Sequence, residues 1–286
     1  RSISCVLNAE NGYEGERHIE AAKSKKKIAV VGAGIAGLEA SRILALRGHD
    51  VTLYERELKI GGQINIAYLP PRKSEMRRSI YENVLKKLPI RFELGHEFTS
   101  ADADGYDEIV VATGAKSLHP RIPGIDNTNV LDSWNVLSGE AIPYGKIAVC
   151  GGGLVGTETA EYLTQRGYKV SIIEMKEKIA AEESSTILPF MMADFKEHQT
   201  ELLPLHKILE FTNEGVKTEV IDKDGNKVGE ELVKADTIIN ALSSVKVLPN
   251  LDGVAKPIHY VGDCAGERPS NIEHAIKSAY DVASQI

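Results

Sequence analysis

Two glycine-rich segments contain the residues of this sequence whose types and spacing are best suited to chemistry. Each follows the pattern G-x-G-x-x-G, with Gly32, Gly34 and Gly37 in the first segment and Gly151, Gly153 and Gly156 in the second. In such a loop the first glycine permits a tight turn, the second lets the backbone approach a pyrophosphate, and the third lets a helix pack closely on a sheet. The pyrophosphate then lies on free N–H groups at the helix N-terminus, where the helix dipole favours negative charge.

A glutamate follows each pattern at the same distance. Glu55 and Glu174 stand 18 residues after Gly37 and Gly156, since 55 − 37 and 174 − 156 both equal 18. An acid about 20 residues past the last glycine is expected to accept hydrogen bonds from a ribose. Each segment therefore predicts a site for one dinucleotide.

The elements that must position these residues recur with them. Residues 27–55 and 146–174 are identical at 13 of 29 aligned positions without a gap. Each copy predicts a strand (28–31 or 147–150), a helix that ends near Gly48 or Gly167, and a second strand (51–55 or 170–174). One such pattern is a weak signal, because glycine turns between strands and helices are common, but two copies in register are a strong one. Two sites for two dinucleotides indicate electron transfer between them.

The rest of the sequence predicts further elements around these two copies. We expect strands over 90–94, 202–211 and 237–242, a strand within 108–114, helices over 74–88 and 185–198, a hairpin turning at 224–226 between 216–222 and 231–234, and a crossover over 116–145. The predicted fold class is α/β, with two Rossmann-like dinucleotide-binding domains, the second inserted in the first. The expected boundaries are a linker over 1–24, a first domain over 25–142 and 237–286, and a second domain over 143–236.

Composition and charge exclude several classes of protein. The chain has 286 residues, with 34 Lys and Arg against 41 Asp and Glu, and a net charge of −7. Such a chain is too acidic for nonspecific nucleic-acid binding and offers no basic face to an anionic membrane. Its longest apolar stretch, from Ile28, is broken by glycines far short of the ~18 residues of a membrane span. Three cysteines without a C-x-x-C pair predict a reducing, cytoplasmic setting, and Arg1 in place of Met predicts a piece of a longer protein.

In these motifs the chain resembles the flavoproteins with two dinucleotide-binding domains, which hold FAD on the first and NAD(P)H on the second. The resemblance assigns the first glycine pattern and Glu55 to FAD, and the second pattern and Glu174 to NAD. Further matches on the FAD side are G-G-Q at Gly61, Gly62 and Gln63, A-T-G at Ala112, Thr113 and Gly114, and G-D at Gly262 and Asp263. In the family the aspartate binds the ribityl chain, and the helix after it, here from about Asn271, directs its positive end at the flavin. Taken singly, Gly61-Gly62 fits a plain turn equally well, and the Asp263 loop fits a helix cap.

The first 26 residues narrow the resemblance. Cys5 to Asn8, followed by Gly12 and by Lys25 to Lys27, is similar to the junction in multidomain enoate and dienoyl-CoA reductases of the old-yellow-enzyme type. In that family an N-terminal TIM barrel holds FMN and a small enoate or enoyl-CoA substrate, and a [4Fe–4S] cluster links the barrel to FAD. The resemblance implies that Cys5 is the fourth cluster ligand, and that the barrel and the other three ligands are missing from this chain. A surface cysteine without a ligand role stays open as an alternative, and the resemblance also allows a homo-oligomer.

Two glutamates bear on the nicotinamide side. Glu174 predicts NADH rather than NADPH, because a carboxylate accepts a hydrogen bond from a ribose 2′-OH and repels a 2′-phosphate. Lys176 and Lys178 act against this preference. Glu158 resembles a family glutamate near the nicotinamide, or is an exposed helix residue like Glu39 at the matching position of the first copy. Two serines follow the strand over 237–242, where relatives usually carry a glycine. Whether a ligand can approach the backbone closely at this point is therefore left open.

Two other functions fit parts of the sequence. A disulfide reductase of the thioredoxin-reductase type needs paired redox cysteines, which Cys5, Cys150 and Cys264 do not form; we interpret Cys150 and Cys264 as structural. A structural module that binds only ADP, as in amine dehydrogenases of the same superfamily, is the remaining alternative. The intact second pattern with Glu174 argues against it, because an idle site need not keep three glycines and the acid in register.

Overall fold

The computed structural model describes residues 5–71, 81, 83–267 and 271–286. The chain forms two compact units. Unit 1 comprises Arg1–Asn65, Ser74–Lys116 and Ser244–Ile286, and unit 2 comprises Ile66–Lys73 and Ser117–Ser243.

Unit 1 is built on a five-stranded parallel sheet in the order β15-β4-β1-β2-β3. Its strands are β1 (Lys27–Val31), β2 (Asp50–Glu55), β3 (Ile90–Leu94), β4 (Glu108–Val111) and β15 (Ile258–Tyr260). The central strands β1, β2 and β4 are buried at every position after the first, as expected of parallel strands covered on both faces, and β1 and β4 are nearly continuous apolar runs.

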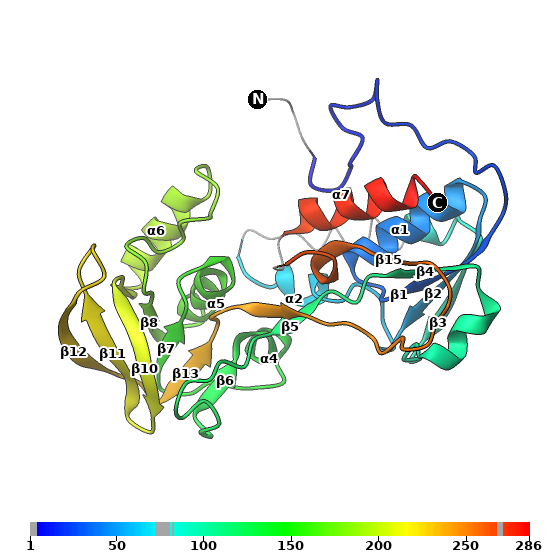
Figure 1. The fold of residues 1–286 in the computed structure, drawn as a ribbon. Coiled ribbons are helices and arrows are strands. Elements are labelled where there is room, and N and C mark those ends of the chain that lie inside the picture. The colour runs from blue at the N-terminus through cyan, green and yellow to red at the C-terminus, as the bar shows by residue number, and fades with distance from the viewer. Residues whose placement is uncertain (1–4, 72–80, 82, 268–270) are drawn as a thin grey trace. The chain divides into compact units, whose positions relative to one another are not determined.

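Helices cover one face of this sheet. The helices α1 (Ile35–Leu46) and α7 (Ile272–Ala283) pack against each other and share a core with Ile28 and Val30 of β1 (Figure 1). Ala29 and Val31 point to the other face, where they pack with Phe98 and with the 3-10 helix η1 (Ser100–Gly105). The short element η2 (Gly262–Cys264) also belongs to this unit, whereas α2 (Ile64–Ala67) spans the boundary at Asn65 between the two units.

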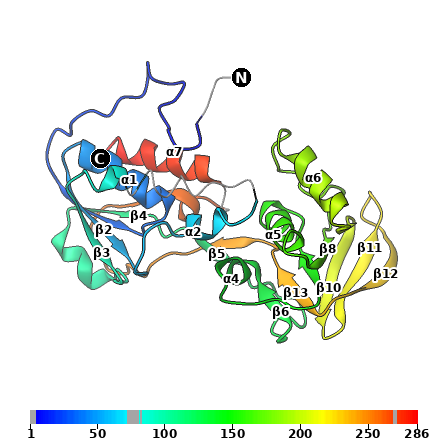
Figure 2. The ribbon, with the colours of Figure 1, turned by 180° about the vertical axis from the view of Figure 1, so that it is seen from behind.

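Unit 2 repeats the same sheet and adds a second one. Its parallel sheet has the order β6-β13-β7-β8-β9, with β6 (Val130–Asp132), β7 (Lys146–Cys150), β8 (Lys169–Ile173), β9 (Glu201–Leu203) and β13 (Thr237–Asn240). One face packs against α4 (Ser133–Ser138), α5 (Leu154–Thr164) and α6 (Leu188–Glu197). The other face packs against an antiparallel sheet of β10 (His206–Thr212), β11 (Gly215–Ile221) and β12 (Lys227–Lys234), seen from behind in Figure 2.

The predicted fold class is confirmed: each unit is a Rossmann-like α/β domain, and the second is inserted in the first. The units divide at other residues than those expected. Strand β13 pairs in parallel with β7 and β6, so residues 117–142 and 237–243 belong to unit 2. The described part of 1–24 belongs to unit 1 and is no separate linker.

Two predicted elements also differ from the structure. The strand predicted over 202–211 is two strands in two sheets, because Pro204 has no N–H to donate and Leu205 is left-handed (φ +60°). The crossover predicted over 116–145 contains β6, α4 and part of β5 (Ala115–Ser117), which pairs with β14 (Ser244–Lys246). The helix predicted over 74–88 lies mostly outside the described residues.

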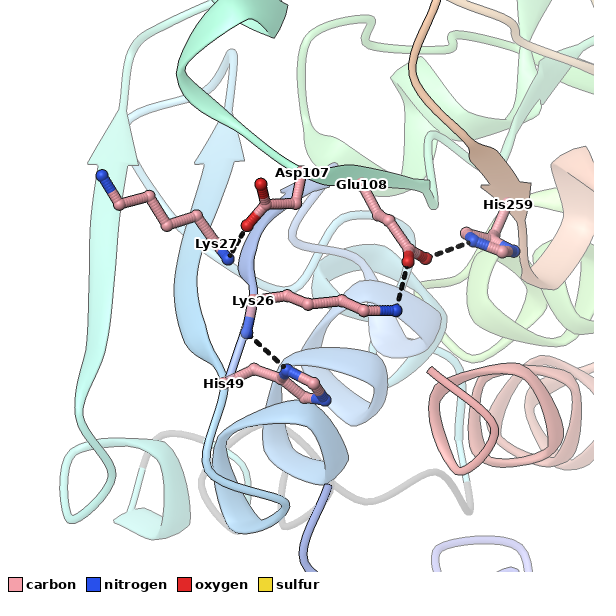
Figure 3. A network of polar contacts seen from close by, with 6 residues as sticks. All are labelled: Lys26, Lys27, His49, Asp107, Glu108 and His259. Atoms are coloured by element: carbon pink, nitrogen blue, oxygen red, sulfur yellow. Dashed lines mark hydrogen bonds and ion pairs between the residues drawn. The ribbon is translucent and has the colours of Figure 1, made fainter. Parts of the chain in front are cut away.

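A polar network closes the edge of the unit 1 sheet at which the strands begin (Figure 3). The Glu108 carboxylate bridges the Lys26 ammonium and His259, whose Nε2 lies 2.8 Å from Oε2. The Lys26 N–H donates to Nδ1 of His49 at 3.2 Å. His49 is 2% exposed, and its Nε2 has no partner among the described residues. Because the glycine motifs lie at the opposite, carboxyl edge, we interpret this network as structural.

We expect acid to weaken the fold in two stages through this network. Burial, with Arg47 and Lys26 adding to it, lowers the pKa of His49 below 6.5, so the unfolded chain binds more protons and stability falls as the pH drops below about 6.5. Burial acts to raise the pKa of Glu108, but Lys26 and His259 outweigh it and the pKa lies below 4.5, so a second loss begins below about 4.5. Each unit of pKa difference contributes about 1.4 kcal/mol.

Urea unfolding between about pH 7.5 and pH 4 measures both stages. The variant His49→Gln should lose the first stage, whereas His18→Gln, at an exposed histidine, should keep it. If the free energy of unfolding of His49→Gln falls with pH below about 6.5 as steeply as that of the parent chain, the first stage does not come from His49.

Candidate dinucleotide sites

The first glycine loop has the geometry that its sequence predicts. Gly32 is left-handed (φ +101°), and a Cβ there would lie 2.6 Å from the Ala112 carbonyl oxygen. A Cβ at Gly37 would lie 1.8 Å from the Gly32 carbonyl oxygen, so α1 packs directly on the turn. At Gly34, in contrast, a Cβ would meet no protein atom within 4 Å. The first and third glycines are therefore fixed by the fold, and Gly34 borders open space at the N-terminus of α1.

The second glycine loop repeats these contacts. Gly151 is left-handed (φ +113°) and its Cβ would lie 2.5 Å from the Ala241 carbonyl oxygen. A Cβ at Gly156 would lie 1.8 Å from the Gly151 carbonyl oxygen, and one at Gly153 would meet nothing within 4 Å. Both loops thus leave the space at which a pyrophosphate approaches the backbone.

The two glutamates hold the two loops in the same way. Glu55 accepts the N–H of Ala33 at 2.8 Å, and Glu174 accepts the N–H of Gly152 at 2.7 Å. The second oxygen of each accepts the N–H two residues later, from Glu57 at 3.0 Å and from Lys176 at 2.9 Å. Each carboxylate is therefore fixed beside its glycine loop, at the end of the second strand of its copy.

The G-G-Q segment lies along the first glycine loop. The Gly61 N–H donates to the Ala33 carbonyl oxygen at 2.8 Å, and a Cβ at Gly62 would lie 3.1 Å from the Gly34 Cα. The Gln63 side-chain amide donates to Asp263 at 3.3 Å, although 200 residues separate them. The structure therefore brings three of the predicted FAD motifs to one place.

The remaining FAD motifs follow β4 and β15 at the same edge. The Ala112 N–H donates to the Val31 carbonyl oxygen at 2.8 Å, and the Thr113 hydroxyl donates to the Val247 carbonyl oxygen at 2.6 Å. Gly114 is left-handed (φ +68°), and a Cβ there would lie 3.4 Å from Gln63 Nε2. Gly262 is also left-handed (φ +69°) and donates to the Ser278 hydroxyl at 2.6 Å. The sequence did not predict that Ser278 holds the backbone of Gly262, because no pattern marks this serine.

The helix α7 begins as predicted. Asn271 is its N-cap, and its side chain accepts the N–H of His274 at 2.9 Å. The apolar residues Ala275, Ile276 and Ala279 are buried against α1 and the sheet.

The serines after β13 have a structural explanation. Ala241 and Leu242 contact Gly151 as Ala112 and Thr113 contact Gly32, so the two copies continue to match through these strands. Ser243 then stands where the first copy has Gly114. Among the described non-glycine residues only Ala180, Gln199 and Leu205 have positive φ, so the backbone at Ser243 does not need a glycine.

The comparison of Glu158 with an exposed Glu39 was wrong. Glu39 is 1% exposed and accepts two hydrogen bonds from Arg42, both at 2.8 Å. Glu158 lies on α5 and is half-buried. Its nicotinamide role stays a prediction.

The three cysteines are all free thiols, and they differ in exposure. Cys5 is exposed, whereas Cys150 and Cys264 are 0% and 2% exposed. Cys264 donates to two backbone carbonyl oxygens, of Val111 at 3.2 Å and of Val261 at 3.1 Å. Neither buried cysteine contacts another cysteine in the part of the chain that the structure describes.

A thiol-reactive dye should therefore modify one cysteine in the folded chain and all three after unfolding. Burial raises the pKa of the Cys150 thiol, which further slows its reaction, because the thiolate is the nucleophile. Counting the modified thiols with and without denaturant checks this expectation. The variant Cys5→Ser should react only after unfolding, and rapid reaction of folded Cys5→Ser would contradict it.

The described residues contain neither a membrane-spanning helix nor a cluster of metal ligands. No helix among them is long and apolar enough to cross a membrane. No three or more of their His, Cys, Asp and Glu side chains are gathered as metal ligands.

Comparison with known proteins places these sites in a family. Residues 26–279 match the family described as pyridine nucleotide-disulphide oxidoreductase. Bilirubin reductase of Mediterraneibacter gnavus is 41% identical over 99% of this chain and 44% of its own length. Cinnamate reductase of Clostridium sporogenes is 32% identical over 100% of this chain and 43% of its own. The solved structure of 2-naphthoyl-CoA reductase superposes with a TM-score of 0.89 at 29% identity, over 99% of this chain and 43% of that one. The chain thus spans less than half the length of these relatives.

Proposed function

Because the chain belongs to the pyridine nucleotide-disulphide oxidoreductase family and is a module of old-yellow-enzyme-like reductases, we propose that unit 1 binds FAD and unit 2 binds NADH. The family consists of flavin-dependent pyridine nucleotide oxidoreductases. The observation that carries the assignment is the repeated geometry at Gly34 and Gly153. At each, an open space borders a helix N-terminus, and a fixed glutamate stands beside the same loop.

Each unit would supply its own binding groups. In unit 1 the N-terminus of α1 faces the pyrophosphate of FAD and Glu55 its ribose, while Gln63 and Asp263 lie on the flavin side. In unit 2 the N-terminus of α5 faces the pyrophosphate of NADH, and Glu174 its adenosine ribose. When bound, the cofactors would supply the redox chemistry, which is hydride transfer from C4 of NADH to N5 of FAD. The side chains of this chain contribute position and charge, and none need act as an acid or base in that transfer.

We further propose that this chain is the electron-input part of a longer reductase. There an FMN-bearing barrel, reached through a [4Fe–4S] cluster, would reduce an activated C=C bond. The resemblance of the Cys5 segment supports this reading, and cinnamate, which one relative is named for, is an enoate.

The described residues hold only part of such a cluster site. A [4Fe–4S] cluster takes four thiolates, whereas this chain offers one exposed thiol, Cys5. The loop of Cys5 closes on itself through the Asn8 N–H, which donates to the Cys5 carbonyl oxygen at 3.3 Å. We propose Cys5 as one ligand, and the other three would have to come from residues outside this chain.

The nucleotide that the purified chain releases on acid denaturation tests the FAD assignment. Chromatography should find FAD bound in equimolar amount. ADP without flavin would support instead the structural module, the alternative known from amine dehydrogenases. The variant Glu55→Gln, which keeps the size of the side chain but removes its charge, should release less FAD than Glu57→Gln, its exposed neighbour.

A further inference from the structure

The N-terminal segment, residues 5–22, is attached to unit 1 along its length. Leu7, Ala9 and Ile19 pack against the core formed by α1 and α7. At the far end the Ala22 N–H donates to the Arg47 carbonyl oxygen at 2.9 Å. Figures 1 and 2 show this dark-blue segment on the side of unit 1 that carries α7. The segment that bears Cys5 is therefore packed against unit 1 as part of its fold.

Arg17 makes four contacts, two within this segment and two with α7. Its Nη1 donates to the Ala9 carbonyl oxygen. The guanidinium lies over the Tyr13 ring at 4.7 Å from the ring centroid and over the Tyr280 ring at 5.5 Å. Its Nη2 lies 3.6 Å from a carboxylate oxygen of Asp281. The Arg17 side chain is 18% exposed, so these contacts are less screened by water than those of a surface arginine.

A second, buried network lies beside the segment. The Arg42 guanidinium forms a bidentate pair with Glu39, and the Tyr81 hydroxyl donates to the same carboxylate at 3.2 Å. The Tyr280 hydroxyl donates to Glu10 of the segment at 3.2 Å. A buried ion pair is costly unless hydrogen bonds complete it, so this one fixes a specific arrangement of α1 and its neighbours.

Electrostatics link this network to the segment. Burial acts to lower the pKa of Arg42, but Glu39 outweighs it with a smaller contribution from Glu10, so the pKa is raised. Burial and Glu39 raise the pKa of Tyr81, and Cys5 adds to this effect. Cys5 and Glu10 therefore lie within electrostatic reach of the network around α1.

We infer that Arg17 is a positioning residue that holds the N-terminal segment on α7, so that the Cys5 loop is presented at one place beside α1. The helix α1 carries the first glycine pattern at its N-terminus, so Arg17 would fix the position of Cys5 relative to the FAD site. The meaning of that position rests on the proposed function, in which Cys5 is the point where electrons leave the module. Holding two redox partners in one geometry is how a protein contributes to transfer between them.

A nitroxide on Cys5 tests this inference in the FAD-loaded 286-residue chain. The label selects Cys5, because Cys150 and Cys264 are buried. We expect an immobilised line shape in the parent chain and a mobile one in Arg17→Met. Arg166→Met is the matched control, since Arg166 also lies over a tyrosine ring (Tyr162, 3.4 Å) and donates to its carbonyl oxygen, but in unit 2. Arg17→Lys, which keeps the charge beside Asp281, should partly restore the immobilised line shape.

The outcomes separate this inference from the proposed function. A mobile label in the parent chain, or the same line shape in Arg17→Met, would overturn the role of Arg17 even if NADH reduces the bound flavin. An immobilised label released by Arg17→Met would support it even if NADH leaves the flavin unchanged. If Arg17→Met does not fold, Asp281→Asn removes one partner of Arg17 from the other side and should raise the mobility of the label in the same sense.

Discussion

Replacing Gly34 with alanine is expected to lower the affinity for FAD by about 100-fold while leaving the stability of the cofactor-free chain unchanged. The backbone of Gly34 is extended (φ −71°, ψ 179°), a conformation that alanine adopts freely, and an added methyl group would meet no protein atom within 4 Å. The methyl group would instead occupy the space at which the pyrophosphate approaches the backbone. A loss of about 2.7 kcal/mol in binding corresponds to that factor of 100.

Gly37 and Gly153 supply the comparisons. Gly37→Ala places its methyl group 1.8 Å from the Gly32 carbonyl oxygen, so we expect a loss of about 3 kcal/mol of folding stability, at the upper end of overpacking effects. Gly153→Ala should lower NADH affinity and leave FAD binding intact. Calorimetric titration with each cofactor and urea unfolding of each variant measure these effects. An alanine at Gly34 that binds FAD normally would show that the pyrophosphate lies elsewhere.

Replacing Glu174 with arginine is expected to shift the preference between NADH and NADPH by at least about tenfold toward NADPH. In the proposed site the carboxylate would repel a 2′-phosphate, whereas a guanidinium in its place would bind it. Glu174 also accepts the N–H groups of Gly152 and Lys176, so the variant should bind NADH more weakly as well. The ratio of kcat/KM for the two nucleotides, with ferricyanide as electron acceptor, reports the shift.

Two variants control for this change. Glu182→Arg makes the same change of charge at a side chain that is 65% exposed and should leave the ratio unchanged. Glu174→Gln removes the repulsion without adding a cation and should move the ratio part of the way. If the ratio of kcat/KM for NADH and NADPH is the same in the parent chain and in Glu174→Arg, the charge at this position does not determine the preference between the two nucleotides.

The sequence predicted the geometry of the glycine loops because the signals for it are local. Gly32 and Gly37 are required by backbone contacts within one strand-turn-helix unit, and Glu55 closes the same unit. The hydrogen bond between Gln63 and Asp263 joins residues far apart in the sequence, and only the known order of motifs in the family brought them together in the prediction.

The errors arose where pairing between distant segments decides the structure. The strand Thr237–Asn240 is buried, and its composition would suit a central strand of either parallel sheet. Its pairing with β7 could therefore not be predicted from the sequence. Glu39 appeared exposed because glutamate usually is, whereas Arg42 and Tyr81 satisfy it in the interior. The role of Arg17 depends on Tyr280 and Asp281, at the other end of the chain.

Anaerobic titration of the FAD-loaded chain with NADH tests the central claim most directly. We predict that equimolar NADH bleaches the flavin absorbance, and that Gly153→Ala needs a much higher NADH concentration for the same bleaching. A flavin whose absorbance does not change with NADH, or a chain that carries ADP and no flavin, would contradict the assignment of FAD and NADH to the two units.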